Sequence, residues 1–309
     1  MGSEARPELV IVQGPTASGK SDLAVRLAER FGGEVINADS MQVYRRMDIG
    51  TAKPSAELRA RVPHHLLDVV EPDEPFSAAD FRSHASRLIA DIQTRGKRAI
   101  LVGGTGLYIK ALTRGLVESP GGDESLRREL EEQAEREGVS ALHRRLAEVD
   151  PAAAARLHPN DRVRIVRALE VFLLTGRTLT SWHEGHGFSE QPYRCLHLGI
   201  EVERALLVRR VEERVDRMIE EGLVAEMEGL LVAGYAPSLK AMSSIGYKEI
   251  CAYLAGACTL DEAIGLIKRN TRQYAKRQLT WFRKDAEINW VEYPAKFDSI
   301  CSIVMEFYN

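Results

Sequence analysis

The feature that most constrains the fold is a glycine-rich octapeptide between a short apolar run and an amphipathic segment. It reads Gly14-Pro15-Thr16-Ala17-Ser18-Gly19-Lys20-Ser21 and fits the P-loop pattern G-x-x-x-x-G-K-[ST]. The run 9–12 before it predicts a buried strand, and 21–31 after it predicts a helix. Such a loop turns backbone N–H groups inward at the positive end of the helix, which makes a site for a diphosphate or triphosphate. We expect Lys20 to reach the terminal phosphate oxygens and the Ser21 hydroxyl to hold Mg²⁺.

Further short apolar runs alternate with helical patterns along the chain. Strands are expected at 34–37, 99–102, 196–200 and 288–291, and helices near 78–95, 203–221, 223–233 and 259–284. This rhythm predicts an α/β fold, a P-loop NTPase-like parallel sheet flanked by helices. Because parallel strands end at the same edge of a sheet, the P-loop, Asp39 and Gly103-Gly104-Thr105 should share one site.

The chain changes character near Ser119-Pro120-Gly121-Gly122. From there to about residue 180 it is strongly charged, helical in pattern and without a strand signal. We therefore predict a helical insertion domain at 121–190. The α/β catalytic core with its C-terminal helices would then be formed by 1–120 and 191–309.

Composition limits the compartment and the partners. The net charge of −3 gives no overall attraction to nucleic acid, but basic residues gather in two stretches, so a local RNA-binding surface is permitted. The four cysteines have no metal-ligand spacing, which favours reduced thiols. No apolar run is long enough to span a membrane, and the N-terminus lacks an apolar targeting core. We expect a soluble, cytoplasmic protein, with a monomer as the default.

Several single residues have more than one interpretation. Asp39, at the end of a strand, could be a Mg²⁺ ligand or a general base, and the spacing alone supports both. Thr105 could contact a ligand oxygen or belong to a plain tight turn. Lys53 could face phosphate or solvent. The adjacent His64 and His65 point in different directions on any regular element, which argues against a shared metal ion.

The basic stretches are 160–167 and 268–284, and the second has seven positive charges and no acid. Its interleaved aromatic residues could stack on bases, or they could face the core of a solvated helix. On the helix at 203–221, Arg210 and Arg214 share a face. They could clamp a pyrophosphate or pair with nearby glutamates.

Together these blocks resemble one family, the tRNA dimethylallyltransferases (isopentenyl-tRNA transferases), in its bacterial form. The resemblance covers nearly the whole chain and rests on these blocks: Gly14–Ser21, Asp39–Tyr44, Asp48–Pro54, His64–Asp68, Ala79-Asp80-Phe81, Gly103–Tyr108, His158–Asp161, Arg167-Ala168-Leu169-Glu170, Ile245–Lys248 and Lys276–Arg283.

The resemblance implies a transferase that moves a dimethylallyl group from dimethylallyl diphosphate to N6 of the adenosine directly 3′ of the anticodon in tRNA. The base would be flipped out of the anticodon loop to reach the site. The implied partners are tRNA and dimethylallyl diphosphate, with Mg²⁺ as cofactor and no membrane. The insertion resembles the family's helical domain that grips the anticodon loop.

Roles carried over from the family are as follows. Asp39 is implied as the base that takes the N6 proton, Thr105 as a residue near the oxygen bridging carbon and phosphorus, and Arg214 with Lys20 as diphosphate ligands beside the P-loop. The implied tRNA contacts are Asp39, Ser40, Met41, Gln42, Thr105, Arg127, Arg162, Val163, Arg164, Ile165, Val166, Ser243, Ser244, Ile245, Gly246, Tyr247, Lys248, Lys276, Arg277, Gln278, Leu279, Thr280, Trp281, Phe282 and Arg283.

Two other functions share the P-loop. An adenylate dimethylallyltransferase, which makes a free cytokinin, shares Asp39 as well, but a free nucleotide needs neither the helical insertion nor the basic stretch 268–284. A nucleotide kinase or ATPase would transfer or release a γ-phosphate, which a phosphate-release assay detects.

Overall fold

The computed structural model describes residues 6–116, 122–186 and 190–309, and in these residues six parallel strands form one sheet of order β3-β2-β4-β1-β5-β6. The predicted α/β fold with a parallel sheet is confirmed. The strands are β1 Glu8–Gln13, β2 Gly33–Asn37, β3 His64–His65, β4 Arg98–Gly103, β5 Arg194–Glu201 and β6 Ile288–Glu292. The central β1 pairs with β4 from Leu9↔Ala99 to Gln13↔Gly103, so the P-loop and the turn after β4 begin side by side.

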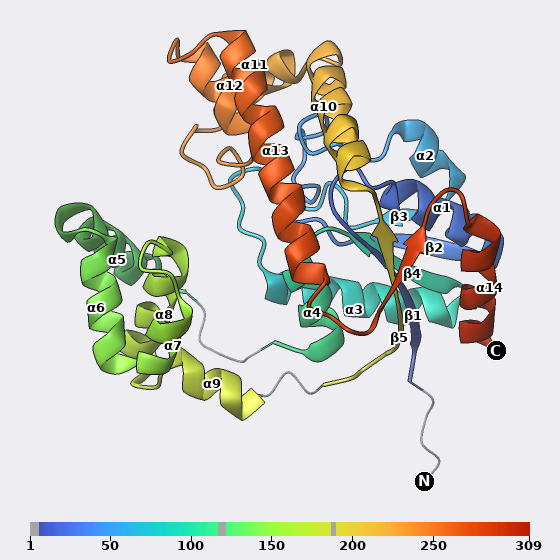
Figure 1. The fold of residues 1–309 in the computed structure, drawn as a ribbon, viewed down its shortest axis with the longest axis horizontal. Helices are drawn as coiled ribbons and strands as arrows, with labels where there is room; N and C mark the ends of the chain where they lie inside the picture. The colour runs from blue at the N-terminus through green and yellow to red at the C-terminus, as the bar shows by residue number, and fades with distance from the viewer. Residues whose placement is uncertain (1–5, 117–121, 187–189) are drawn as a thin grey trace. The chain divides into compact units, whose positions relative to one another are not determined.

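Alternate residues of the strands pack into two cores, one on each face of the sheet. On one face Leu9 and Ile11 pack with the helices α3 Ala78–Thr94, α4 Gly106–Arg114, α10 Arg204–Glu220, α11 Leu223–Val232, α12 Tyr247–Leu254 and α13 Leu260–Phe282. On the other face Val10 and Val12 pack with α1 Lys20–Phe31 and α14 Phe297–Tyr308. Figure 1 shows α1 and α14 to the right of the sheet and α13 to its left.

The chain divides into two compact units, Met1–Thr113 with Gln191–Asn309, and Arg114–Glu190. The second unit is built from α5 Glu124–Glu137, α6 Val139–Val149, α7 Pro151–Arg156, α8 Arg162–Thr175 and α9 Leu179–His186. It has its own apolar core, which includes Leu142, Leu146 and Ile165. Residues 119–121, where the sequence predicts the boundary, lie outside the described residues.

Some elements were not predicted. The edge strand β3 has only two residues, and α2 Ala56–Arg61 has six, so neither carries a periodic pattern. At the C-terminus α14 buries Ile300, Cys301 and Val304 against the α1 side of the sheet. None of the helices in the described residues is both long and apolar enough to cross a lipid bilayer.

Candidate active site

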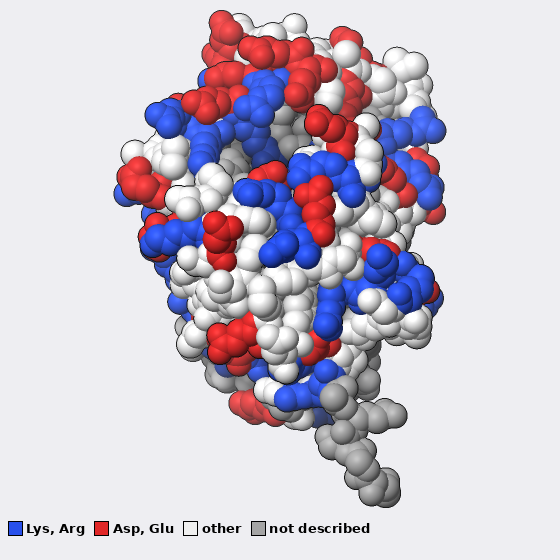
Figure 2. Space-filling view, turned by 90° about the vertical axis from the view of Figure 1, so that its right-hand side faces the viewer, with Lys and Arg blue, Asp and Glu red and all other residues white. Residues whose placement is uncertain are grey.

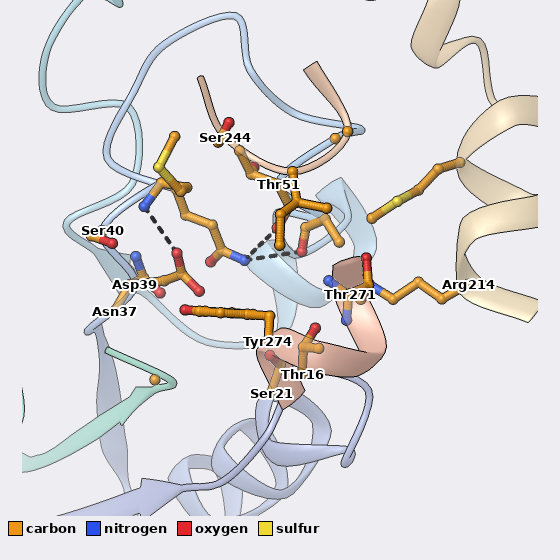
Figure 3. A pocket seen from close by; sticks show the side chains of 18 of the residues that line it. Thr16, Ser21, Asn37, Asp39, Ser40, Thr51, Arg214, Ser244, Thr271 and Tyr274 are labelled. Atoms are coloured by element: carbon orange, nitrogen blue, oxygen red, sulfur yellow. Dashed lines mark hydrogen bonds between the residues drawn. The ribbon is translucent and has the colours of Figure 1, made fainter. Parts of the chain in front are cut away.

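A cavity of about 380 Å³ lies in the first unit at the carboxyl ends of β1, β2 and β4. Side chains from the P-loop, the end of β2, α10 and α13 face one another across it (Figure 3). The predicted site residues that line it are Thr16, Lys20, Ser21, Asp39, Ser40, Met41, Gln42, Arg214, Ser243, Ser244, Ile245, Gly246 and Gln278. The sheet topology therefore brings the P-loop and Asp39 into one cavity, as the strand order requires.

The P-loop has the backbone of an anion site. Ala17 and Gly19 are left-handed, with φ of 62° and 95°. No side chain caps α1, so its first N–H groups remain available at the positive end of the helix. The Ser18 hydroxyl is buried and has no hydrogen-bond partner within the described residues. These donors suit the oxygens of a bound phosphate ester.

Two cations face the cavity without an ion-pair partner among the described residues. In this part of the chain Lys20 Nζ donates only to the Pro15 carbonyl, at 3.3 Å, and Arg214 forms no hydrogen bond or ion pair. Burial, and then the positive charge of Arg214, lowers the pKa of Lys20 to about 8, while Asp39 acts in the opposite direction. Burial likewise lowers the pKa of Arg214. Two desolvated cations this close together favour the binding of a polyanion.

Arg210, the other arginine considered for a pyrophosphate clamp, does not line the cavity. Neighbouring acids on α10 pair elsewhere: Glu213 lies 3.6 Å from Arg209, and Asp216 lies 2.6 Å from Lys268. The structure therefore distinguishes the two arginines and leaves Arg214 as the one directed at the site.

Asp39 is held by a tight turn and by the turn after β4. Its Oδ1 accepts the Met41 N–H at 2.9 Å. The Thr105 hydroxyl accepts the Ser40 N–H at 3.0 Å and donates to Ser40 Oγ at 3.3 Å, while the Thr105 N–H donates to the Ala38 carbonyl at 3.2 Å. Thr105 thus fixes the chain on both sides of Asp39, and it is not among the cavity-lining residues.

One face of α13 forms a wall of the cavity, with Ile267, Thr271, Tyr274 and Gln278 at helical spacing. Tyr274 extends across the cavity with its hydroxyl end toward Asp39 (Figure 3). Burial and the Asp39 charge raise the pKa of Tyr274, so its hydroxyl stays protonated. Sequence reasoning placed Tyr274 on an RNA surface or in the core. Together the four residues have the spacing i, i+4, i+7, i+11, and this spacing is the signal that identifies the face.

The opposite face of α13 is exposed and basic. Lys276, Arg277, Thr280 and Arg283 are exposed, and Trp281 is 46% exposed. Gln278 and Phe282 of the same predicted tRNA segment are buried, and Leu279 is partly buried. Only the exposed side of this predicted segment could therefore contact RNA, because its other side packs against the protein.

The loop 48–54 is held by the buried ammonium group of Lys53 and by the buried carboxamide of Gln42. Lys53 does not face phosphate or solvent: its Nζ donates to Asp68 at 2.6 Å, to Asp48 at 2.7 Å and to the Tyr44 carbonyl. Gln42, also buried, donates to the carbonyls of Thr51 and Ala52 at 3.0 and 3.1 Å. This loop contributes Gly50, Thr51, Ala52 and Pro54 to the cavity wall.

Glu226 of α11 holds the start of the same loop. Its carboxylate accepts the N–H groups of Asp48, Ile49 and Gly50 at 2.8, 2.7 and 3.1 Å, and the Tyr247 hydroxyl at 2.5 Å. Tyr247, implied as a tRNA contact, is fully buried, whereas the next residue, Lys248, is exposed. Tyr247 therefore supports the cavity wall from within.

Some of the predicted tRNA residues of the helical unit are buried and others are exposed, as the period of the helix requires. Ile165 and Val166 are buried in its core, whereas Val163 is 79% exposed. Arg162 and Arg164 are partly or fully exposed, at 3.1 Å from Glu135 and 3.3 Å from Asp161. Arg127 lies 3.0 Å from Glu170, a fully buried carboxylate that Arg167 also contacts. Of these residues, only the exposed ones have side chains that RNA could contact.

The two histidines have separate partners. His64 Nδ1 lies 2.8 Å from the Val62 carbonyl, and His65 Nε2 lies 2.8 Å from Glu34. On the face that Figure 2 presents, Lys/Arg and Asp/Glu side chains are interspersed.

Comparisons with known proteins agree along the whole chain. The family model for IPP transferase matches residues 42–285. The tRNA dimethylallyltransferases of Geobacter metallireducens and Geobacter sulfurreducens are 73% and 68% identical, each over 100% of both chains. Among solved structures, the tRNA isopentenylpyrophosphate transferase of Bacillus halodurans has a TM-score of 0.73 at 45% identity, covering 98% of this chain and 97% of that one.

A eukaryotic dimethylallyltransferase acting on tRNA has a TM-score of 0.79 at 30% identity, covering 97% of this chain and 78% of that one. The family model, the sequence relatives and the solved structures thus all point to one family. The chain belongs to the IPP transferase family, the tRNA dimethylallyltransferases.

Proposed function

We propose that this protein transfers the dimethylallyl group of dimethylallyl diphosphate to N6 of the adenosine directly 3′ of the anticodon in tRNA. The observation that carries the proposal is that Lys20 and Arg214, which have no ion-pair partner among the described residues, line one cavity with Asp39. The cations suit a diphosphate leaving group, and the carboxylate suits an amine that must lose a proton.

The reaction couples three bond changes. The N6 nitrogen forms a bond to C1 of the allyl group while the bond from C1 to the diphosphate oxygen breaks. An exocyclic adenine amine is a weak nucleophile, so Asp39 assists by accepting its proton as the C–N bond forms. Lys20, Arg214 and the P-loop N–H groups stabilise the charge on the departing diphosphate. No phosphoryl group is transferred.

The family needs a divalent metal ion, and we propose Mg²⁺. The described residues contain no cluster of three His, Cys, Asp or Glu side chains able to hold a metal. That fits Mg²⁺, which usually takes one or two protein oxygens and completes its shell with substrate phosphates and water. The Ser21 hydroxyl lines the cavity, makes no hydrogen bond within the described residues and is our proposed ligand. When bound, Mg²⁺ would neutralise charge on the leaving diphosphate.

We further propose that tRNA contacts the exposed members of the predicted segments 276–283 and 162–166, and that the helical unit grips the anticodon loop. We also propose a monomer as the active form.

Incubation with labelled dimethylallyl diphosphate, Mg²⁺ and either unmodified tRNA or AMP tests the function. Label in tRNA that carries an adenosine 3′ of the anticodon, and none in AMP, is the expected result. Label in AMP would mean a free-nucleotide prenyltransferase. Absence of transfer with release of phosphate from ATP would mean a nucleotide kinase or ATPase.

A further inference from the structure

Gln278 links two glycine-rich turns that are far apart in sequence. Its Oε1 accepts the Thr16 N–H of the P-loop at 2.8 Å, and its Nε2 donates to the Gly104 carbonyl after β4 at 2.9 Å. The side chain is only 5% exposed. A Cβ atom on Gly104 would lie 2.2 Å from Nε2, so a glycine is needed for the carboxamide to approach this backbone.

The turn after β4 is also bonded to the chain around Asp39. Thr105 binds the carbonyl of Ala38 and the N–H of Ser40, on either side of the carboxylate. Hydrogen bonds and the peptide bond between Gly104 and Thr105 therefore connect the two neighbours of Asp39 to Gln278 and then to Thr16. One end holds the proposed base, and the other holds the cradle of the proposed leaving group.

We propose that Gln278 is a positioning residue that fixes the spacing between the diphosphate cradle and Asp39; the inference rests on the proposed prenyl transfer. The ladder between β1 and β4 ends at Gln13 and Gly103, before the P-loop and the turn diverge. Beyond that point the Gln278 carboxamide bridges them. Transfer requires the N6 atom to meet C1 at a near-attack distance, and small misplacements lower the rate strongly.

This role differs from direct contact with tRNA. The amide oxygen and nitrogen are both bound to protein backbone, whereas Arg277 beside it is exposed. A tRNA contact at Gln278 predicts weaker tRNA binding on substitution. Positioning predicts that tRNA still binds while the allyl group reaches the wrong acceptor. That acceptor is water, whose oxygen bonds to C1 as the C1–diphosphate bond breaks, with its proton released to solvent.

The test is Gln278→Met, which keeps the length of the side chain and removes both hydrogen bonds. The ratio of dimethylallyl alcohol to prenylated tRNA is measured with labelled dimethylallyl diphosphate and saturating tRNA. We expect that ratio to rise by about tenfold or more and kcat for transfer to fall by about 100-fold, with KM for tRNA within about threefold of wild type. The ratio does not depend on the fraction of folded enzyme, so loss of stability alone leaves it unchanged.

Gln273→Met, at an exposed site on the same helix, is the matched control and should leave the ratio at the wild-type value. Gln278→Glu keeps the acceptor for Thr16 and loses the donor to Gly104, so it should give an intermediate ratio. If Gln278→Met does not fold, the ratio measured for Gln278→Glu tests the positioning role instead. A wild-type ratio in the folded variants, or a raised KM for tRNA alone, overturns the positioning role. Absence of transfer by the wild-type enzyme would instead overturn the proposed function.

Discussion

At the scale of single residues, the site is defined by charges that have no partner among the described residues. The buried Lys53 and the partly buried Arg272 are both paired with carboxylates, as such cations usually are. Lys20 and Arg214 are not, and the nearby carboxylate of Asp39 accepts only a backbone N–H in the same part of the chain. Such unbalanced groups destabilise the free protein, so their presence points to a ligand that balances them.

Asp39→Ala should lower kcat for prenyl transfer by about 100-fold to 10,000-fold, since general-base assistance contributes in that range. Binding of tRNA should change little, because the base acts mainly in the transition state. Single-turnover transfer and a filter-binding assay measure the two effects. Turnover at the wild-type rate would exclude Asp39 as the base.

Pyrophosphate binding should weaken as the pH rises above the Lys20 pKa of about 8. Below that pH the ammonium is charged and attracts the anion, and above it the free protein must take up a proton to bind. Affinity should therefore fall by up to about tenfold per pH unit above 8. Calorimetric titration from pH 7 to 9.5 measures this, and Lys20→Met controls for titration of the ligand. Equal slopes for both proteins would contradict the assignment.

At the scale of elements, loop 48–54 and α13 both form walls of the cavity, and residues elsewhere in the chain hold the loop in place. Three consecutive N–H groups of the loop converge on Glu226 of α11, and the buried Lys53 closes its other end. The helix α13 combines a wall of the cavity on one face with exposed basic residues on the other. The position of each wall of the cavity therefore depends on contacts with distant residues, which the sequence of the element itself does not reveal.

Glu226→Ala should lower the free energy of unfolding by about 2–4 kcal/mol, because three N–H groups of the loop and the buried Tyr247 hydroxyl lose a charged acceptor. Tyr247→Phe removes one hydrogen bond to the same carboxylate and should lower it by about 1 kcal/mol. Urea denaturation measures both, with Glu228→Ala, exposed on the same helix, as the control. A loss at Glu226 no larger than at Glu228 would show that the loop does not depend on this carboxylate.

Charge reversal at Arg277 and Arg283, both exposed on or directly after α13, should weaken tRNA binding. The slope of log K against log salt concentration should fall by about one for each phosphate that the variant no longer neutralises. Lys97→Glu is the control, since Lys97 is exposed beside the start of β4, at the other end of the strands. An unchanged salt slope would exclude this face of α13 as the RNA surface.

At the scale of the whole molecule, the two units have separate cores and the net charge is −3. Attraction to RNA must therefore come from local groups of basic residues rather than from the overall field. The exposed arginines of α8 in the helical unit and of α13 in the first unit are the groups that the sequence and the structure both indicate. If one tRNA contacts both, the free energies of the two sets of contacts should add.

Arg164→Glu and Arg277→Glu should each weaken tRNA binding, and the double variant should weaken it by the product of the two factors. Binding at several salt concentrations measures all three proteins. Arg144→Glu, exposed on α6 of the same helical unit, should bind as wild type does. A double variant no weaker than either single variant would mean that the two units do not contact the tRNA independently.

The sequence by itself determined the local features: the P-loop between its strand and helix, Asp39 and Thr105 at strand ends, and the alternating strand and helix patterns from which a parallel sheet was predicted. Each depends on residues within a few positions of one another, so a pattern is enough to reveal it. The tertiary structure decided which charges remain unpaired, and it turned Gln278 and Tyr247 inward. Those outcomes depend on contacts such as Thr16 with Gln278, separated by 262 residues, and Glu226 with Gly50, separated by 176. Only the packing of distant elements brings such groups together, and no local pattern records it.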